Sequence, residues 1–136
     1  MIIEIDGHKF DAVFEEENSP ETCAAFKKAM PFISQVVHVR WSGEGMWIPL
    51  GDRDFGVGYE DATRHPTPGQ IILYPKGASE TEILIAYGCV AFGSKAGPLS
   101  GNHFATITSD LPKLREIGMS TMWEGAKSIR FIAEDE

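Results

Sequence analysis

Glycine and proline interrupt this sequence at short intervals, and they limit what the chain can fold into. The chain has 136 residues, of which 14 are glycine and 8 are proline. Because proline breaks a helix interior and glycine destabilises one, long uninterrupted helices are not expected. Between these residues lie short apolar segments, several of which alternate with polar residues as half-buried strands do. The sequence therefore predicts a turn-rich, mainly β protein.

The N-terminal segment predicts a β-hairpin followed by a short helix. Asp6 and Gly7 favour the positive φ angles of a tight hairpin turn, and they separate two short apolar segments. Ser19-Pro20-Glu21 is typical of a helix start, with a capping hydroxyl, a proline in the first turn and an acid near the positive end. Apolar residues then recur at helical spacing until Pro31. We expect a helix at about 20–30.

The rest of the chain predicts further short strands and a second helical turn. This turn is expected at about 111–117, ended by Gly118. The segment 51–69 has no periodicity and is expected to be a functional or mobile loop. The further strands are expected at 32–41, 46–50, 70–74, 82–87, 102–108 and 128–133.

Strands of this length and spacing favour a closed barrel, because closure removes exposed strand edges. We expect a single domain, residues 1–136, that is mainly β. Its fold is predicted as a closed antiparallel β-barrel of about eight strands with one short helix and a second helical turn.

The charge of the chain argues against polyanionic partners. Lysine and arginine number 12 against 20 acidic residues, and the net charge of −8 repels nucleic acid and anionic membrane surfaces. The start of the sequence does not read as a secretory signal. The longest apolar segment, 83–92, is shorter than the roughly 17 residues of a bilayer span. We expect a cytoplasmic protein with no nucleic-acid or membrane partner.

Neither the cysteines nor the histidines show the spacing of a metal or redox site. Cys23 and Cys89 lie outside any Cys-x-x-Cys motif. We interpret both as buried free thiols, with a disulfide or a reactive thiol as the alternative. The four histidines form no His-x-His or His-Glu-x-x-His pattern. We expect no metal and no cofactor, and the sequence identifies no catalytic residue.

Four residues are candidates for a ligand-binding cleft: Arg40, Trp47, His103 and Phe104. Arg40 lies on a predicted strand near two tryptophans. It is either a surface residue paired with Glu44 or the anchor for a carbonyl or carboxylate group in an aromatic cleft. His103 and Phe104 open a later predicted strand, where a polar group precedes an aromatic ring.

Other polar and aromatic residues have mainly structural interpretations. Asn102 is expected to tie down a loop, with ligand contact as the alternative. Trp123 is interpreted as a core residue in a bend. Glu80 and Glu82 lie on one face at a strand start and are interpreted as two solvated acids, with a general-base role as the alternative.

The order of several motifs resembles that of the cyclophilins. The motifs are the hairpin, the helix start, His38-Val39-Arg40, Gly101-Asn102-His103-Phe104 and an aromatic-acid-glycine bend before the last strand. The chain is also similar to a family of small uncharacterised bacterial proteins with a cyclophilin-like barrel. That similarity rests on Arg40-Trp41-Ser42-Gly43-Glu44, Trp47, Pro68-Gly69, Tyr87-Gly88, Gly101-Asn102, Phe104 and Trp123-Glu124-Gly125. The resemblance covers most of the chain and implies a cyclophilin-like fold.

Cyclophilins are peptidyl-prolyl isomerases, and the resemblance matches Arg40 to their arginine. Such an arginine and a dry apolar pocket favour the twisted state of the X-Pro bond over the planar one. Ala105 stands where cyclophilins have the phenylalanine that walls the proline pocket. A pocket without that wall loses contact area for the proline ring.

Three hypotheses of function follow. The leading one is a small-molecule-binding cyclophilin-like barrel of unknown substrate, with or without catalysis, in which Arg40 anchors an anionic or carbonyl group. The second is peptidyl-prolyl cis-trans isomerisation, with altered pocket residues. The third is a non-catalytic interaction or assembly module, which a homo-oligomer would fit.

Overall fold

A computed structural model gives the fold and describes residues 1–134. The elements follow one another as β1 (Ile2–Ile5), β2 (His8–Phe14), α1 (Pro20–Lys28), β3 (Phe32–His38), the 3-10 helix η1 (Arg40–Ser42), β4 (Gly43–Pro49), β5 (Ala62–Thr63), β6 (Gln70–Tyr74), β7 (Glu82–Val90), β8 (Gly93–Ser94), β9 (Gly97–Pro98), β10 (Gly101–Ile107), α2 (Leu111–Glu124) and β11 (Lys127–Ile132).

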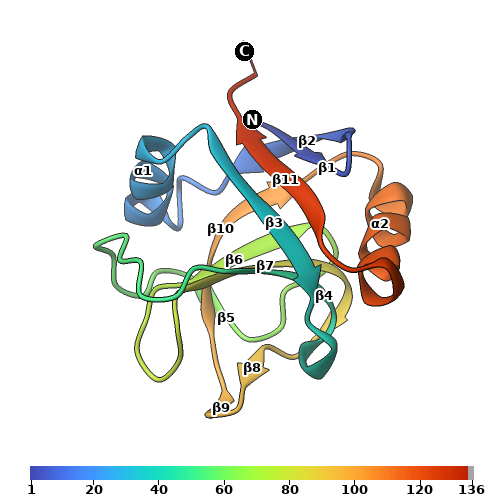
Figure 1. Ribbon diagram of the computed structural model, residues 1–136. Helices are drawn as coiled ribbons and strands as arrows, with labels where there is room; N and C mark the ends of the chain where they lie inside the picture. The colour runs from blue at the N-terminus through green and yellow to red at the C-terminus, as the bar shows by residue number, and fades with distance from the viewer. Residues whose placement is uncertain (135–136) are drawn as a thin grey trace.

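Eight of the strands form a closed antiparallel barrel (Figure 1). In sheet order they are β2, β1, β11, β3, β4, β7, β6 and β10, and pairing of β10 with β2 closes the ring. At this closure Ala105 lies opposite Phe14, and Ile107 lies opposite Ala12. The two helices lie on opposite sides of the barrel. This arrangement confirms the predicted mainly β, closed antiparallel barrel of about eight strands.

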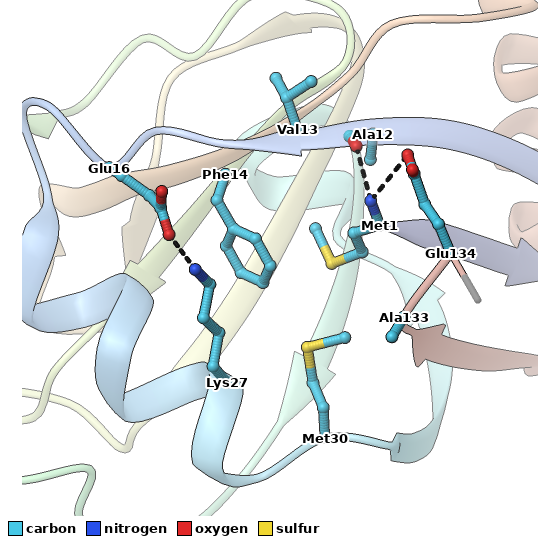
Figure 2. A pocket seen from close by; sticks show the side chains of 9 residues that line it. All are labelled: Met1, Ala12, Val13, Phe14, Glu16, Lys27, Met30, Ala133 and Glu134. Carbon is cyan, nitrogen blue, oxygen red and sulfur yellow. Dashed lines mark hydrogen bonds and ion pairs between the residues drawn. The ribbon is translucent and has the colours of Figure 1, made fainter. Parts of the chain in front are cut away.

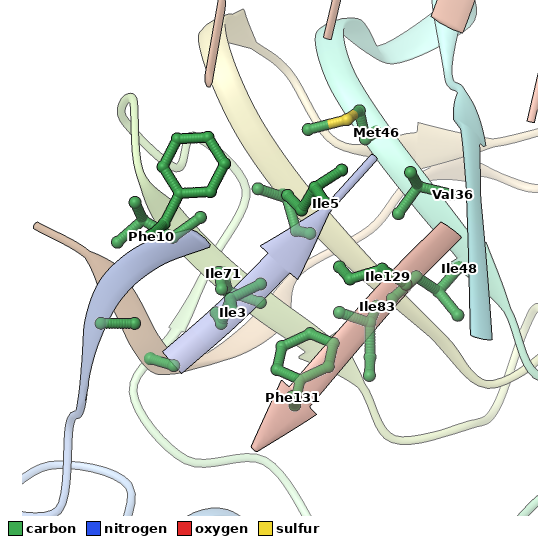
Figure 3. Close-up of a cluster of buried hydrophobic side chains, with 14 of the residues drawn as sticks. Ile3, Ile5, Phe10, Val36, Met46, Ile48, Ile71, Ile83, Ile129 and Phe131 are labelled. Atoms are coloured by element: carbon green, nitrogen blue, oxygen red, sulfur yellow. The ribbon is translucent and has the colours of Figure 1, made fainter. Parts of the chain in front are cut away.

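Large apolar side chains fill the barrel interior (Figure 3). Ile3 and Ile5 alternate inward along β1, as the two-residue period of a strand requires. Phe26 reaches into this core from α1 and packs against Phe104 and Phe131, with ring centroids 5.0 Å apart in each pair. All five side chains are fully buried. Removal of this apolar surface from water is the main force that closes the barrel.

The outer face of β7 carries a second hydrophobic cluster. Ile83 and Ile85 belong to the barrel core, whereas Leu84 and Ala86 belong to the outer cluster. Trp47 of β4 lies opposite Leu84 and packs against the outer cluster. A strand that is buried on both faces has a continuous apolar sequence, which explains segment 83–92. The other buried members of the outer cluster are Val39, Ile72, Tyr74, Val90, Phe92 and Leu99.

Helix α1 lies close to its predicted position, but Ser19 does not cap it. The Glu60 carboxylate accepts hydrogen bonds from the backbone N–H groups of Glu21 (3.1 Å) and Thr22 (2.7 Å). It thereby satisfies free N–H groups at the positive end of the helix. The Ser19 hydroxyl instead donates to the His103 carbonyl oxygen at 2.8 Å. A loop residue distant in sequence therefore supplies the cap.

Helix α2 is longer than the predicted 111–117, because Gly118 does not end it. The helix continues to Glu124. The ring of Tyr87 packs against Gly118, where a Cβ atom would lie 2.3 Å from Cδ2 of the tyrosine. The helix ends at Gly125, whose φ of +92° favours glycine. Gly118 is thus explained by a tertiary contact and not by helix termination.

The predictions for Trp123, Cys89 and the strand at 32–41 were wrong. Trp123 is not a core residue, because its position on α2 leaves it 79% exposed. Cys89 is exposed, although Cys23 is buried as predicted and both thiols are free. The predicted strand 32–41 ends at His38, and Arg40 begins the 3-10 helix.

Asn102 holds the long loop between β4 and β6. Its Oδ1 accepts a hydrogen bond from the Glu60 backbone N–H at 3.0 Å, and its Nδ2 donates to the Gly58 carbonyl oxygen at 2.8 Å. The interpretation of Asn102 as a residue that ties down a loop is confirmed. Across residues 1–134, no helix has both the length and the apolar character to cross a bilayer.

Candidate functional site

Three surface pockets differ in whether the protein itself pairs their charged groups. The first lies between α1 and β2 (Figure 2). Here the Lys27 ammonium pairs with the Glu16 carboxylate. The amino group of Met1 donates to the Ala12 carbonyl oxygen and to the Glu134 carboxylate, each at 3.2 Å. The charges of this pocket are therefore satisfied.

The second pocket, here called the α2 pocket, lies between the first turns of α2, the end of β7 and residues 65–68. Arg115 Nη2 donates to Glu44 Oε2 at 2.7 Å, and Glu44 Oε1 accepts from the Cys89 backbone N–H at 3.0 Å. These two interactions hold the pKa of Glu44 below its usual value, and the hydrogen bond from Arg115 has the larger effect. The guanidinium carbon lies 5.7 Å from the centre of the Tyr87 ring. The charges are again paired.

The third pocket, here called the tryptophan pocket, has a volume of about 860 Å³. It is lined by Trp41 and Trp47, by residues 78–80 with Glu82, and by Arg64 with Ala91 and residues 93–98. The two indole ring centroids are 5.6 Å apart at an interplanar angle of 78°, which is a favoured edge-to-face arrangement. Trp41 is 63% exposed. The pocket therefore presents aromatic surface to solvent.

Glu82 is a buried acid in the tryptophan pocket. It is the first residue of β7, lies opposite Pro49 and Tyr74 on the adjacent strands, and is 5% exposed. Burial raises the pKa of its carboxyl to about 7; Glu80 adds to the rise and Trp47 opposes it. Within residues 1–134, Glu82 takes part in no salt bridge. The carboxyl is thus near its midpoint of ionisation at neutral pH.

The indole N–H of Trp47 lies close to the Glu82 carboxyl. It is buried and makes no hydrogen bond of ordinary geometry to any residue that the structure describes. Its proximity to Glu82 lowers the pKa of that carboxyl only in part. An unpaired buried N–H costs roughly 1–3 kcal/mol, and such groups are rare in native proteins. The Trp47 indole N–H therefore lies against the Glu82 carboxyl without ordinary hydrogen-bond geometry, and this carboxyl has no cationic partner within residues 1–134.

Basic groups also line the tryptophan pocket. Arg64 Nε donates to the Phe92 carbonyl oxygen at 3.2 Å, and the Phe92 backbone N–H donates to the Arg64 carbonyl oxygen at 2.8 Å. These bonds fix Arg64 beside the β8–β9 hairpin, which carries Lys95 between its strands. In the part of the chain described, neither base forms a salt bridge. The terminal guanidinium nitrogens of Arg64 suit a carboxylate.

The structure does not bring the four sequence-predicted site residues together. Trp47 lines the tryptophan pocket, whereas Arg40 and His103 line none of the three pockets. Phe104 is 0% exposed and belongs to the barrel core, because its position on β10 faces inward. Glu44, the alternative partner considered for Arg40, binds Arg115 instead.

Sequence reasoning missed Arg64 and misassigned Glu82. Glu82 is buried and not solvated, because it starts a strand that is covered on both faces. Its place directly before the apolar segment 83–92 is the signal that indicates this burial. Arg64 lies in the aperiodic segment 51–69, which carries no such signal. Among residues 1–134, no group of three or more His, Cys, Asp or Glu side chains is placed to hold a metal ion.

Comparison with known proteins supports the fold and shows the family. The solved structure of McbB in complex with tryptophan matches 99% of this chain with a TM-score of 0.77 and 19% sequence identity. This chain spans only 45% of the McbB chain, and the similarity at this identity concerns the fold. A search of curated proteins found no match. Residues 1–133 match the family described as "Protein of unknown function (DUF3830)", and the chain belongs to that family.

Proposed function

We propose that the tryptophan pocket binds a small molecule with a flat apolar part and an anionic or carbonyl group. The observation that carries this proposal is the combination in one pocket of Trp41 and Trp47 with Arg64, whose guanidinium forms no salt bridge within residues 1–134. Its volume of about 860 Å³ lies within the range of roughly 300–1,000 Å³ that is typical of small-molecule sites. Such sites combine apolar walls with a few polar groups that fix orientation.

In this proposal the indole rings contact the flat part of the ligand, and Arg64 binds its anionic or carbonyl group. The aromatic, arginine-anchored cleft predicted from the sequence is kept, but the anchor is Arg64 in place of Arg40. A protein of the same fold, McbB, has been solved in complex with tryptophan. That complex supports a small aromatic molecule as the class of ligand to test first.

Isothermal titration calorimetry with indole-3-propionate tests the proposal, because this probe has an indole ring and a carboxylate but no amine. We expect a Kd below about 1 mM. Trp47→Ala should weaken binding at least about tenfold through lost aromatic contact. Arg64→Gln should also weaken it about tenfold, because the charge-assisted hydrogen bonds are lost.

Trp123→Ala is the matched control, because Trp123 lies on α2 and outside the pocket. It should bind the probe as the unchanged protein does. Absence of binding, or binding that is insensitive to both pocket variants, would contradict the proposal. Light scattering provides a separate check, since an oligomer that buries Trp41 and Trp47 would make this surface an interface between copies.

A further inference from the structure

Resting on the proposed function, we infer that the tryptophan pocket selects ligands that carry a protonated amine, bound between Glu82 and the two indole rings. Charged groups of both signs line the pocket. Glu80 and Glu82 lie on the segment 78–82, whereas the basic groups lie on Arg64 and residues 91–98. A ligand with both an amine and a carboxylate complements the acidic and the basic groups. An aromatic amino acid is the simplest molecule of this class.

The burial of Glu82 is the first reason for the amine. A buried carboxylate is stable only with a positive partner, and it otherwise keeps its proton. Nothing in residues 1–134 supplies that partner to Glu82. Glu44, which Arg115 neutralises in the α2 pocket, shows that the same fold provides a cation where the acid is structural. We therefore assign the positive partner of the Glu82 carboxylate to the ligand, as an ammonium group.

The arrangement of the tryptophans is the second reason. The ring planes of Trp41 and Trp47 meet at 78°, with centroids 5.6 Å apart. An ammonium group placed against two such rings contacts their π electrons. A cation–π contact together with a charge-assisted hydrogen bond to Glu82 favours an amine over the same molecule without one.

The expected chemistry includes a proton. Near pH 6.5, Glu82 is mostly protonated because burial raises the pKa of its carboxyl to about 7. Binding of an ammonium group stabilises the carboxylate form, so the proton leaves Glu82 and passes to the buffer. A ligand without the amine does not stabilise the carboxylate, so its binding should not release the proton of Glu82.

The test compares L-tryptophan with indole-3-propionate, which differ by one amino group, by calorimetry at about pH 7.5. We expect L-tryptophan to bind at least about tenfold more tightly. Glu82→Gln should bring the affinity for L-tryptophan down to that for indole-3-propionate. Glu116→Gln is the control, because Glu116 is an exposed acid on α2, paired with Lys113, and this variant should keep the preference.

A second measurement does not depend on any variant. Titration of L-tryptophan near pH 6.5 in two buffers of different ionisation enthalpy should show release of about half a proton or more per ligand. Equal affinities for the two ligands, a preference that persists in Glu82→Gln, or binding of L-tryptophan without proton release would overturn the inference. None of these results would contradict the proposed function if binding of indole-3-propionate still depends on Trp47 and Arg64. The proposed function itself fails if neither ligand binds.

Discussion

Glu44 of the α2 pocket and Glu82 of the tryptophan pocket lie near opposite ends of the ladder between β4 and β7. At one end Gly43 pairs with Val90, and at the other Pro49 pairs with Glu82. Each pocket contains a glutamate close to an aromatic ring. Glu44 is partly exposed and paired with Arg115, and its pKa is lowered. Glu82 is buried with no cation paired to it among residues 1–134, and its pKa is raised to about 7.

The contrast teaches how to separate a structural charge from a functional one in a small barrel. An acid whose partner is supplied by the fold contributes to stability at neutral pH. An acid that is buried without a partner costs stability as it ionises, and such groups cluster at binding and catalytic sites. Substitutions at the two ends of this ladder should therefore have opposite pH dependence.

The largest expected effect comes from Glu82→Gln. Because folding raises the pKa of Glu82 from 4.5 to about 7, the unfolded chain ionises first as the pH rises. The free energy of unfolding should then fall across this window, by up to about 3 kcal/mol at about 1.4 kcal/mol per pKa unit. The Glu82→Gln variant does not lose this free energy of unfolding. Its stability relative to the unchanged protein should therefore increase between about pH 4.5 and pH 8.

Urea denaturation at the two pH values measures this difference, with Glu116→Gln as the control for a surface acid. A gap between Glu82→Gln and the unchanged protein that stays constant with pH would show that Glu82 is solvated. The contrast between the two ends of the ladder would then be lost.

The next effect concerns the close packing behind the α2 pocket. Alanine in place of a glycine in a helix interior ordinarily stabilises by about 1 kcal/mol. Gly118→Ala should instead destabilise by about 1 to 2 kcal/mol, because its Cβ would lie 2.3 Å from the Tyr87 ring. Thermal denaturation measures the change. Gly58→Ala is the control, since its Cβ meets no atom within 4 Å, and a stabilised Gly118→Ala would show that the ring is free to move.

The smallest effect is expected for Glu44→Gln, because both partners of its salt bridge are partly exposed. The variant should be slightly less stable at about pH 7. The lowered pKa of Glu44 gives stability that is present above its unfolded pKa and is lost as the pH falls through its folded pKa. The stability of the two proteins should therefore converge as the pH falls through the folded pKa of Glu44, and also in about 1 M salt. A difference that grows at low pH would contradict the pairing with Arg115.

The fold was predictable because its information is local. Hairpin turns such as Asp6-Gly7 and the two-residue alternation along β1 are visible in short segments. The length of α2 was not predictable in this way. Gly118 looks like a helix end in sequence, and only the packing of Tyr87, a residue on a distant strand, explains it.

The site was predictable only in part, for the same reason. Trp47 sits among aromatic and polar residues that suggest a cleft, but its pocket is completed by residues 78–82, Arg64 and 91–98. Those segments are distant in sequence and meet only in the folded protein. Phe104 shows the limit of local reasoning, because the side of a strand that faces the core depends on which strands pair with it.

The position of β11 between β1 and β3 has a consequence for how the chain folds during synthesis. The last strand pairs with the first strand on one side, Ile2 opposite Ile132, and with β3 on the other, Phe32 opposite Phe131. Nearly the whole chain must therefore leave the ribosome before β1 and β3 acquire their shared neighbour. Until then the N-terminal strands expose apolar residues and unpaired edges, which is the state most prone to aggregation. Barrel closure is thus a late event in folding. The tryptophan pocket cannot form before the strands that support it.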